Sequence, residues 1–330
     1  AGPARSNIAN ALFDRVAEAR VLSNNLSAGL FGAMVETART YGGGAVAVED
    51  TVTGTLTRKR LLISARVLGR RFAAITEPGE AVGVLLPNAN GAVVTFFGLQ
   101  SGGRIAAMLN YTSGPANIAS AVRTAKIRTI VSSRAFIEKA ELGDLVTAID
   151  GTGAKILWLE EVRETISTQE KLEAALLWSR PLHPVKPEDA AVILFTSGSE
   201  GTPKGVVLSH CNLHSNAAQA DARVTISVKD TLFNVLPVFH SFGLTGGTIL
   251  PLLFGVRLFL YPSPLHFKQI PQIAAKVKPT IMFGTDTFLA GYSRAAKDSD
   301  FSSLRFVVAG AEAVRSDTRK TYLERFNTLI

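Results

Sequence analysis

The sequence predicts an α/β fold built from two doubly wound, mainly parallel sheets. Short apolar strands alternate with amphipathic helices along almost the whole chain, which is the pattern of repeated βα units. The predicted strands are apolar on both faces, as expected for parallel sheets covered by helices on each side. A chain of 330 residues is also long enough to form two such units.

A helix, a strand and a second helix are predicted before the first series of βα units. The first helix covers residues 28–40, and the strand lies near residues 45–48. Thr57 is placed to cap the second helix, whose apolar residues recur at helical spacing. The arginines of this second helix could touch a lipid or carrier surface, but a solvated helix face is the simpler interpretation.

The first βα series follows, and it ends in a more charged segment at residues 160–189 that we interpret as helix plus linker. Its strands are predicted at residues 81–86, 105–109, 127–131 and 155–159, and its helices at 89–100, after Gly114-Pro115 and from Ser133.

This charged segment leads to an apolar strand at residues 191–195 and a loop, after which the pattern resumes with a short strand at 206–208 and a helix that Ser209 caps. The later strands are predicted at residues 233–236, 256–261, 280–283 and 306–309, and the later helices at 242–253, 267–277, 287–297 and 314–326.

This order of elements suggests four segments. We expect an N-terminal segment (1–27) and a helix–strand–helix segment (28–74) that packs on the second subdomain. The first α/β subdomain (75–222) includes the loop after residue 195, and the second (223–330) is incomplete at its C-terminal end.

Composition narrows the class of protein. The net charge of +8 is compatible with anionic partners, but no basic run is interleaved with aromatic residues as in nucleic-acid binders. The single cysteine, Cys211, excludes an intramolecular disulfide and fits the cytoplasm. Residues 231–256 carry no charged side chain and could span a bilayer by length, but Pro237 and Gly243 divide them, which favours a buried βα unit.

The loop at residues 196–205 is the most informative segment. It offers many N–H and O–H donors and one cation, which together suit a polyphosphate, although a polar hairpin without a ligand is the alternative. The candidate phosphate contacts are Thr196, Ser197, Gly198, Ser199, Gly201, Thr202 and Lys204. A Walker A loop is excluded because the fifth residue after Gly198 is Pro203, and a nucleophile elbow because its first glycine is missing.

Three further positions follow predicted strands, where ligands bind in open α/β sheets. His240 and Phe242 lie where a helix begins after one strand, and Gly310-Ala311-Glu312 follow another. Gly284 and Thr285 follow a third strand and could open a channel for an acyl chain. A core histidine and ordinary βα turns are the alternatives. No group of histidine, cysteine and carboxylates has metal-ligand spacing.

Taken together, residues 196–205, 237–243 and 309–312 resemble the ordered motifs of the acyl-adenylate-forming enzymes. Residues 236–243, 259–266 and 283–292 look most like the acyl-ACP synthetase part of bacterial bifunctional 2-acylglycerophosphoethanolamine acyltransferase/acyl-ACP synthetases. Residues 86–90 and 108–114 extend the resemblance into the first half of the chain, so that it covers about residues 28–330. The resemblance implies the two stacked sheets of an adenylate-forming N-terminal domain.

The resemblance implies that a fatty acid attacks the α-phosphorus of ATP, giving acyl-AMP and pyrophosphate. The phosphopantetheine thiol of an acyl carrier protein (ACP), or of CoA, then takes the acyl group. The same resemblance implies catalytic roles for Thr196, Lys204 and His240. It places residues 310–312 beside the adenine. The implied substrate contacts are His240, Phe242, Gly284 and Thr285.

The family's Tyr-Gly-x-Thr-Glu motif, which supplies the main Mg²⁺ ligand, is expected beyond Ile330. The sequence is therefore expected to be a truncated adenylation domain that binds ATP weakly and adenylates poorly alone. An acyl-CoA synthetase and a non-catalytic nucleotide-binding module remain alternatives. The resemblance also implies a protein at the inner face of a bacterial membrane, peripheral or anchored through other parts of a longer chain.

Overall fold

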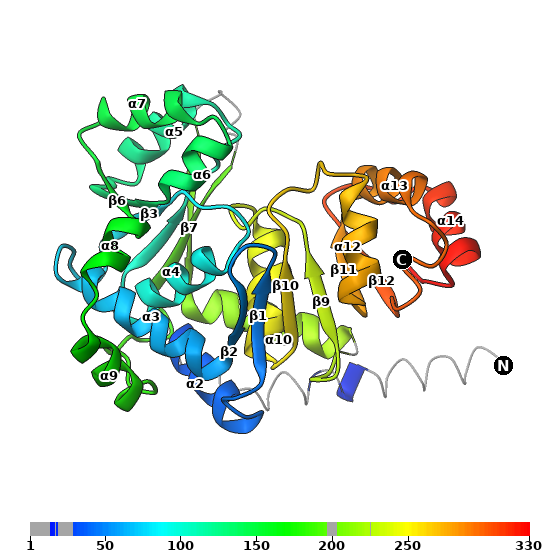
Figure 1. Cartoon of the computed structure of the whole chain (residues 1–330), viewed down its shortest axis with the longest axis horizontal. Helices are drawn as coiled ribbons and strands as arrows, with labels where there is room; N and C mark the ends of the chain where they lie inside the picture. Colours follow the sequence, from blue (N-terminus) through cyan, green and yellow to red (C-terminus); the bar gives the residue numbers. More distant parts are fainter. Residues whose placement is uncertain (1–13, 17, 19–28, 197–202, 225) are drawn as a thin grey trace.

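Two six-stranded sheets lie side by side and are flanked by helices in the computed structural model of the chain (Figure 1). The structure describes residues 14–16, 18, 29–196, 203–224 and 226–330. Most neighbouring strands in both sheets run parallel, and the prediction of an α/β fold with two mainly parallel sheets is confirmed.

The first sheet has the strand order β6-β5-β3-β4-β7-β8. Its strands are β3 (Ala81–Val84), β4 (Ile105–Met108), β5 (Thr129–Ser132), β6 (Lys155–Trp158), β7 (Ala190–Thr196) and β8 (Lys204–Ser209). All neighbours are parallel except β8, which forms an antiparallel hairpin with β7. Its connecting helices are α4 (Asn90–Ser101), α5 (Pro115–Thr124), α6 (Arg134–Lys139), α7 (Gly143–Asp150), α8 (Leu159–Thr165) and α9 (Thr168–Leu176).

The second sheet has the strand order β12-β11-β9-β10-β1-β2. Its strands are β1 (Val46–Asp50), β2 (Gly54–Thr57), β9 (Thr231–Asn234), β10 (Arg257–Leu260), β11 (Ile281–Gly284) and β12 (Phe306–Ala309). The early strands β1 and β2 enter this sheet because β1 pairs with β10. The other elements are α2 (Leu30–Thr40), α3 (Arg58–Ala73), α10 (His210–Arg223), the π-helix η1 (Phe242–Ile249), α11 (Leu250–Leu253), α12 (Gln269–Val277), α13 (Asp286–Ala295) and α14 (Ser316–Phe326).

Local capping signals placed several helices correctly. The Thr57 hydroxyl accepts a hydrogen bond from the Arg60 N–H at the start of α3, and Ser209 forms a capping box with Asn212 at the start of α10. One predicted helix differs in kind: residues 242–253 are helical, but they begin as a π-helix and only then become α-helical.

The basic face of α3 is not simply solvated, which corrects that interpretation. The Arg58 guanidinium is buried and donates to the carbonyls of Gly42 and Gly255, the second at 2.6 Å. Arg66 is also buried and donates to the carbonyl of Arg180. Arg71 pairs with Glu170 of α9 at 2.8 Å. These arginines therefore attach α3 to distant segments: Arg58 and Arg66, both buried, satisfy main-chain oxygens, and Arg71 forms an ion pair with α9.

A single apolar cluster links the two sheets. It includes Val84 and Phe97 from the first sheet and its helix α4, and Leu258 and Ile281 from the second sheet. The segment 231–256 contributes buried residues to this cluster, in agreement with its interpretation as a buried βα unit. Within the described part of the chain, no helix is long and apolar enough to cross a membrane.

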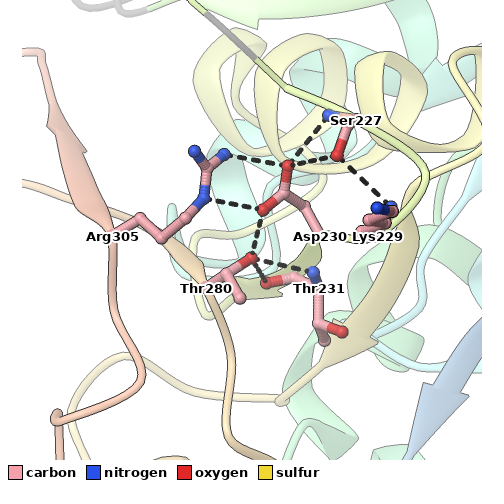
Figure 2. A network of polar contacts seen from close by, with 6 residues as sticks. All are labelled: Ser227, Lys229, Asp230, Thr231, Thr280 and Arg305. Atoms are coloured by element: carbon pink, nitrogen blue, oxygen red, sulfur yellow. Dashed lines mark hydrogen bonds and ion pairs between the residues drawn. The ribbon is translucent and has the colours of Figure 1, made fainter.

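The residues that immediately precede three strands of the second sheet meet at the Asp230 carboxylate (Figure 2). Its oxygens accept hydrogen bonds from Thr280 at 2.7 Å, from Arg305 at 2.9 Å and from the Ser227 N–H at 2.8 Å. Burial alone would raise the pKa of Asp230, but these donors outweigh it and the net pKa is lowered. The carboxylate therefore holds the starts of β9, β11 and β12 together.

We expect Asp230→Ala to lower the free energy of unfolding by about 2–3 kcal/mol, since it leaves the Thr280 hydroxyl and a half-exposed Arg305 without this acceptor. Urea denaturation at pH 7 measures the loss. Asp298→Ala is the control, because Asp298 pairs with Arg325 at the surface. Asp298→Ala should lower the free energy of unfolding by less than about 1 kcal/mol. Equal losses in the two variants would show that the Asp230 network contributes no more than a surface ion pair.

Candidate functional site

The carboxyl ends of strands from both sheets meet at one place. Asn88 follows β3, and its side chain bonds the Leu236 carbonyl at 2.6 Å and the Val238 N–H at 2.9 Å, both in the segment after β9. Tyr111 follows β4, and its ring packs edge-on against Phe239 with centroids 4.7 Å apart. Because β7 neighbours β4 in parallel, its carboxyl end faces the same region. This is where open α/β sheets bind ligands.

The candidate phosphate loop connects the two strands of the β7–β8 hairpin. Thr196 ends β7 and Lys204 begins β8, and the two residues are paired directly across the hairpin. Both are exposed, so the Thr196 hydroxyl and the Lys204 ammonium are available at the mouth of the loop. The other predicted contacts (Ser197, Gly198, Ser199, Gly201 and Thr202) lie outside the described residues.

His240 lies on the surface at the turn between β9 and η1. Its N–H donates to the Pro237 carbonyl at 3.1 Å, and its carbonyl accepts from the Leu244 N–H at 2.9 Å. The ring packs against Phe239 with centroids 4.7 Å apart. Partial desolvation by these surroundings lowers the pKa of His240, so the imidazole is neutral at pH 7. It can therefore exchange hydrogen bonds with a ligand without adding a charge.

Phe242 connects the β9 turn with the ends of β11 and β12. Its ring stacks on Phe283 with centroids 5.2 Å apart and an interplanar angle of 27°. A Cβ atom added to Gly310 would lie 3.1 Å from the Phe242 ring, so the glycine allows the β12 turn to approach this ring closely. The structure therefore brings together Phe242 and Gly310, which the sequence assigned to the acyl and adenine sides of the site.

The turn after β12 is held to the start of α13. Glu312 accepts hydrogen bonds from the Thr287 N–H at 2.7 Å and from its hydroxyl at 3.1 Å. The Thr287 N–H and then the Thr285 hydroxyl are the main causes of a lowered pKa for Glu312. Ala311 has a φ of +68°, in the left-handed region that non-glycine residues seldom adopt. Such strain is common at binding sites, where the surroundings maintain it.

Gly284 and Thr285 lie in the turn between β11 and α13. A Cβ on Gly284 would meet the side chain of Leu289 at 2.9 Å, and the Gly284 carbonyl accepts from the Gly310 N–H at 3.2 Å. The Thr285 hydroxyl caps α13. Both residues therefore shape the turn next to Phe283, and Phe283 lines the adjacent cavity.

This cavity has a volume of about 340 Å³ and lies between η1, α10 and the second sheet. Its size is at the lower end of the range typical of small-molecule sites. Most of its lining residues are apolar, and the polar side chains among them are those of Asn216, Ser241 and Thr245. Its lining residues are Asn216, Ala220, Val224, Ile226, Leu232, Ser241, Phe242, Thr245, Gly246, Leu250, Phe283 and Val308.

Sequence reasoning missed the wall that α10 supplies. Ala220, in the last turn of α10, and Val224, the residue just after the helix, both line the cavity. Their helical spacing indicated only a buried face, because nothing local identifies the surface that the face meets. The sequence analysis also did not foresee that Asn88 and Tyr111 contact the turn after β9, although both lie in segments that carry the family resemblance (86–90 and 108–114).

A magnesium site is not assembled by the residues that the structure describes. Among them, no group of three or more histidine, cysteine, aspartate or glutamate side chains is arranged to hold a metal ion. We therefore assign no described residue as a Mg²⁺ ligand.

Comparison with known proteins identifies relatives of the chain. The family model of AMP-binding enzymes matches residues 34–330. The chain is 26% identical to 4-coumarate–CoA ligase 2 of Nicotiana tabacum over 256 residues, which are 76% of this chain and 46% of the relative. It is 25% identical to the medium-chain-fatty-acid–[acyl-carrier-protein] ligase TtuA of Teredinibacter turnerae over 300 residues, which are 79% of this chain and 47% of the relative. The matched region spans about half the length of these relatives.

Solved structures share the fold. The anthranilate CoA ligase AuaEII, in complex with anthranoyl-AMP, superposes with a TM-score of 0.79 at 22% identity, covering 94% of this chain and 59% of that one. At this level of identity the likeness supports the fold alone.

Proposed function

The chain belongs to the AMP-binding enzymes, the acyl-adenylate-forming superfamily, and from this premise we propose that it activates a fatty acid as acyl-AMP. In the second step of this proposal, the thiol of a phosphopantetheine group attacks the acyl carbon, AMP leaves, and a thioester forms. The preferred acceptor is an acyl carrier protein, and CoA is the alternative. TtuA, which acts on an acyl carrier protein, supports the first acceptor, and the 4-coumarate–CoA ligase supports the second.

One observation carries this proposal: the ring of Phe242 lines the apolar cavity and also lies against the Gly310 turn. An acyl chain in the cavity and an adenine at the turn would then have their reactive ends close together. Adenylation requires this arrangement, because the carboxylate must reach the α-phosphorus of the same nucleotide. The apolar wall favours an alkyl or aryl acid over a polar one.

In this proposal the described residues have separate tasks. Lys204 and Thr196 bind the pyrophosphate end of ATP and offset the negative charge that grows on it as the bond to the α-phosphorus breaks. Neutral His240 donates a hydrogen bond near the carboxylate, at the boundary of the acyl and nucleotide regions. Residues 310–312 flank the adenine, with the carboxylate of Glu312 fixing the turn through Thr287.

ATP and Mg²⁺ are the cofactors expected of this family. When bound, Mg²⁺ would neutralise phosphate charge. The proposed link to 2-acylglycerophosphoethanolamine reacylation, and to a membrane surface, is supported by the motif resemblance alone. The division into segments 1–27, 28–74, 75–222 and 223–330 likewise stays a proposal.

A single-turnover assay tests the function. The protein is held in excess over α-³²P-labelled ATP with Mg²⁺, and decanoate, hexadecanoate, 4-coumarate or benzoate is added. We expect labelled acyl-AMP with the fatty acids, and release of the label as AMP when ACP carrying phosphopantetheine is supplied. Because protein exceeds ATP, product is detected even when turnover is slow, and its rate measures the expected weak activity. Binding of ATP without any adenylate would favour the non-catalytic module instead.

A substitution in the cavity wall tests the acyl assignment. Ala220 lines the cavity from α10, and Ala220→Phe should fill part of its volume. We expect the dissociation constant of hexadecanoate to rise more than tenfold, which corresponds to a loss of about 1.4 kcal/mol or more of binding free energy. The dissociation constant of octanoate should change less than threefold. Ala148→Phe, on α7 of the first sheet, is the control for the added aromatic ring. An equal loss of affinity for hexadecanoate and octanoate would contradict the proposal that this cavity limits the length of the acyl chain.

A further inference from the structure

The π-helix η1 is widened at the point where it supplies the wall of the cavity. Phe242, Thr245 and Gly246 face the cavity, whereas Gly243, Gly247 and Thr248 face the buried side chain of Asn234. A π-helix hydrogen-bonds from residue i to residue i+5, is rare, and occurs frequently at functional sites. The side chains that stabilise the wide turn therefore determine where its cavity face lies.

Two buried side chains converge on one carbonyl of this helix. The Gly243 carbonyl accepts hydrogen bonds from the Thr248 hydroxyl at 2.9 Å and from the Asn234 amide at 3.1 Å. Asn234 also contacts the Thr248 hydroxyl at 3.3 Å. The exposed fractions of Asn234 and Thr248 are 0% and 2%, so water cannot replace these bonds. A buried carbonyl with two side-chain donors is held more firmly than helix geometry alone requires.

The two glycines on this side of η1 are required by close contacts. A Cβ on Gly247 would lie 2.5 Å from the carboxamide of Asn234, so only glycine allows that side chain to lie against the helix. A Cβ on Gly243 would lie 2.2 Å from the Pro237 carbonyl oxygen. The helix therefore packs directly on the turn that precedes His240.

Asn234 also fixes that turn. Its Oδ1 atom accepts from the Leu236 N–H at 2.9 Å, and Asn88 holds the next residues through the Leu236 carbonyl and the Val238 N–H. Asn88 is 1% exposed. The same carboxamide thus joins the wide turn of η1 to the segment that presents His240. Neither Asn234 nor Thr248 lines the cavity, so their influence on a ligand must act through these neighbours.

We propose that Asn234 and Thr248 are positioning residues for the carboxylic acid substrate: by holding the Gly243 carbonyl they keep η1 wide, fix Phe242 in the wall of the cavity and fix His240 in the turn that leads into η1. This inference rests on the proposed function for the identity of the substrate. The positioning itself is a property of the ligand-free chain and can be measured separately.

Thr248→Val is the main variant, because valine has nearly the shape of threonine but lacks the hydroxyl. Thr248→Ser restores the hydroxyl and is the rescue variant. Asn234→Ala is a second, more disruptive test. Thr76→Val is the matched control: Thr76 is buried in the first half of the chain and its hydroxyl donates to the Phe72 carbonyl at 2.6 Å.

The first readout is ligand binding by the full chain, measured by calorimetry with decanoate and with ATP separately. For Thr248→Val we expect the dissociation constant of decanoate to rise about five- to tenfold. This is the change in affinity that corresponds to the loss of one buried hydrogen bond. The constant for ATP should change less than twofold, and Thr248→Ser should return decanoate binding to within twofold of wild type. Thr76→Val should lower the melting temperature without changing either constant.

The second readout is amide hydrogen exchange without ligand. Thr248→Val should speed exchange of the Leu236, Val238 and Leu244 amides, whereas amides in α4 should keep their rates. A variant that melts earlier but keeps both decanoate affinity and these exchange rates would overturn the positioning role and leave Thr248 a purely structural residue. If wild type binds no carboxylic acid, the proposed function fails, and the exchange rates still decide whether the two residues hold η1 and its turn.

Discussion

Replacing Lys204 by alanine is expected to weaken ATP binding by about 10- to 100-fold, which corresponds to the roughly 1.5–3 kcal/mol of a charge-assisted hydrogen bond. Lys204 is exposed at the start of β8 and pairs across the hairpin with Thr196, so its ammonium stands at the mouth of the candidate phosphate loop. Because the side chain is exposed, the substitution should change the free energy of unfolding by less than about 0.5 kcal/mol. Titration calorimetry with ATP and with AMP measures the effect.

The comparison of the two nucleotides makes this experiment specific. AMP lacks the β- and γ-phosphates, so its affinity should fall less than threefold in Lys204→Ala. Lys204→Arg keeps the positive charge, so its affinity for ATP should fall less than tenfold. Lys268→Ala removes an exposed lysine at the start of α12 and is the control for net charge. An equal loss for ATP and AMP would place the lysine near the adenosine part, and no loss at all would exclude the hairpin as a phosphate site.

The elements set by local chemistry were predictable from the sequence. Thr57 and Ser209 cap helices as expected, because a cap depends on residues within one turn. The apolar strands of both sheets were found for a similar reason, since a strand buried on both faces has a continuous apolar sequence. Thr196 ends a strand, and His240 and Gly310 come after strands, so their position at one edge of the fold could also be predicted.

The features that were missed depend on partners far apart in the chain. The burial of Arg58 could not be foreseen, because the carbonyl it binds belongs to Gly255. The widening of η1 depends on Asn234, eight residues before the helix begins, and its periodicity resembles that of an ordinary α-helix. The cavity needed α10 to be placed against the second sheet. Spacing predicts which residues a helix buries, but it does not name the surface that receives them.

The largest expected effect on stability concerns His210, which attaches α10 to the start of α2. Its Nδ1 atom accepts from the Leu30 N–H at 3.2 Å, and its side chain is buried, with 1% exposed. Burial lowers the pKa of His210 to about 4, although the Asp189 carboxylate acts in the opposite direction. His214, one turn later, is also buried, its Nδ1 has no hydrogen-bond partner, and burial lowers its pKa too.

The folded protein therefore keeps His210 neutral under conditions in which the unfolded chain, with a pKa near 6.5, binds a proton. Stability is fully present above pH 6.5 and is lost as the pH falls from about 6.5 to about 4. We expect His210 to account for a loss of about 3 kcal/mol over this range, and His214 adds a loss of the same sign. Urea denaturation at half-unit pH steps measures the slope.

His210→Gln should reduce this slope, because glutamine accepts a hydrogen bond but does not titrate. Phe31→Leu is the matched control: Phe31 is buried in the same helix α2 that His210 holds, with 2% exposed. It should lower stability by about 1 kcal/mol at every pH and leave the slope unchanged. A His210→Gln protein with the full wild-type slope would show that other groups cause the acid sensitivity. A reduced slope would show that neutral His210 contributes to the acid sensitivity, as expected if it attaches α2 to α10, the helix that lines the cavity through Asn216 and Ala220.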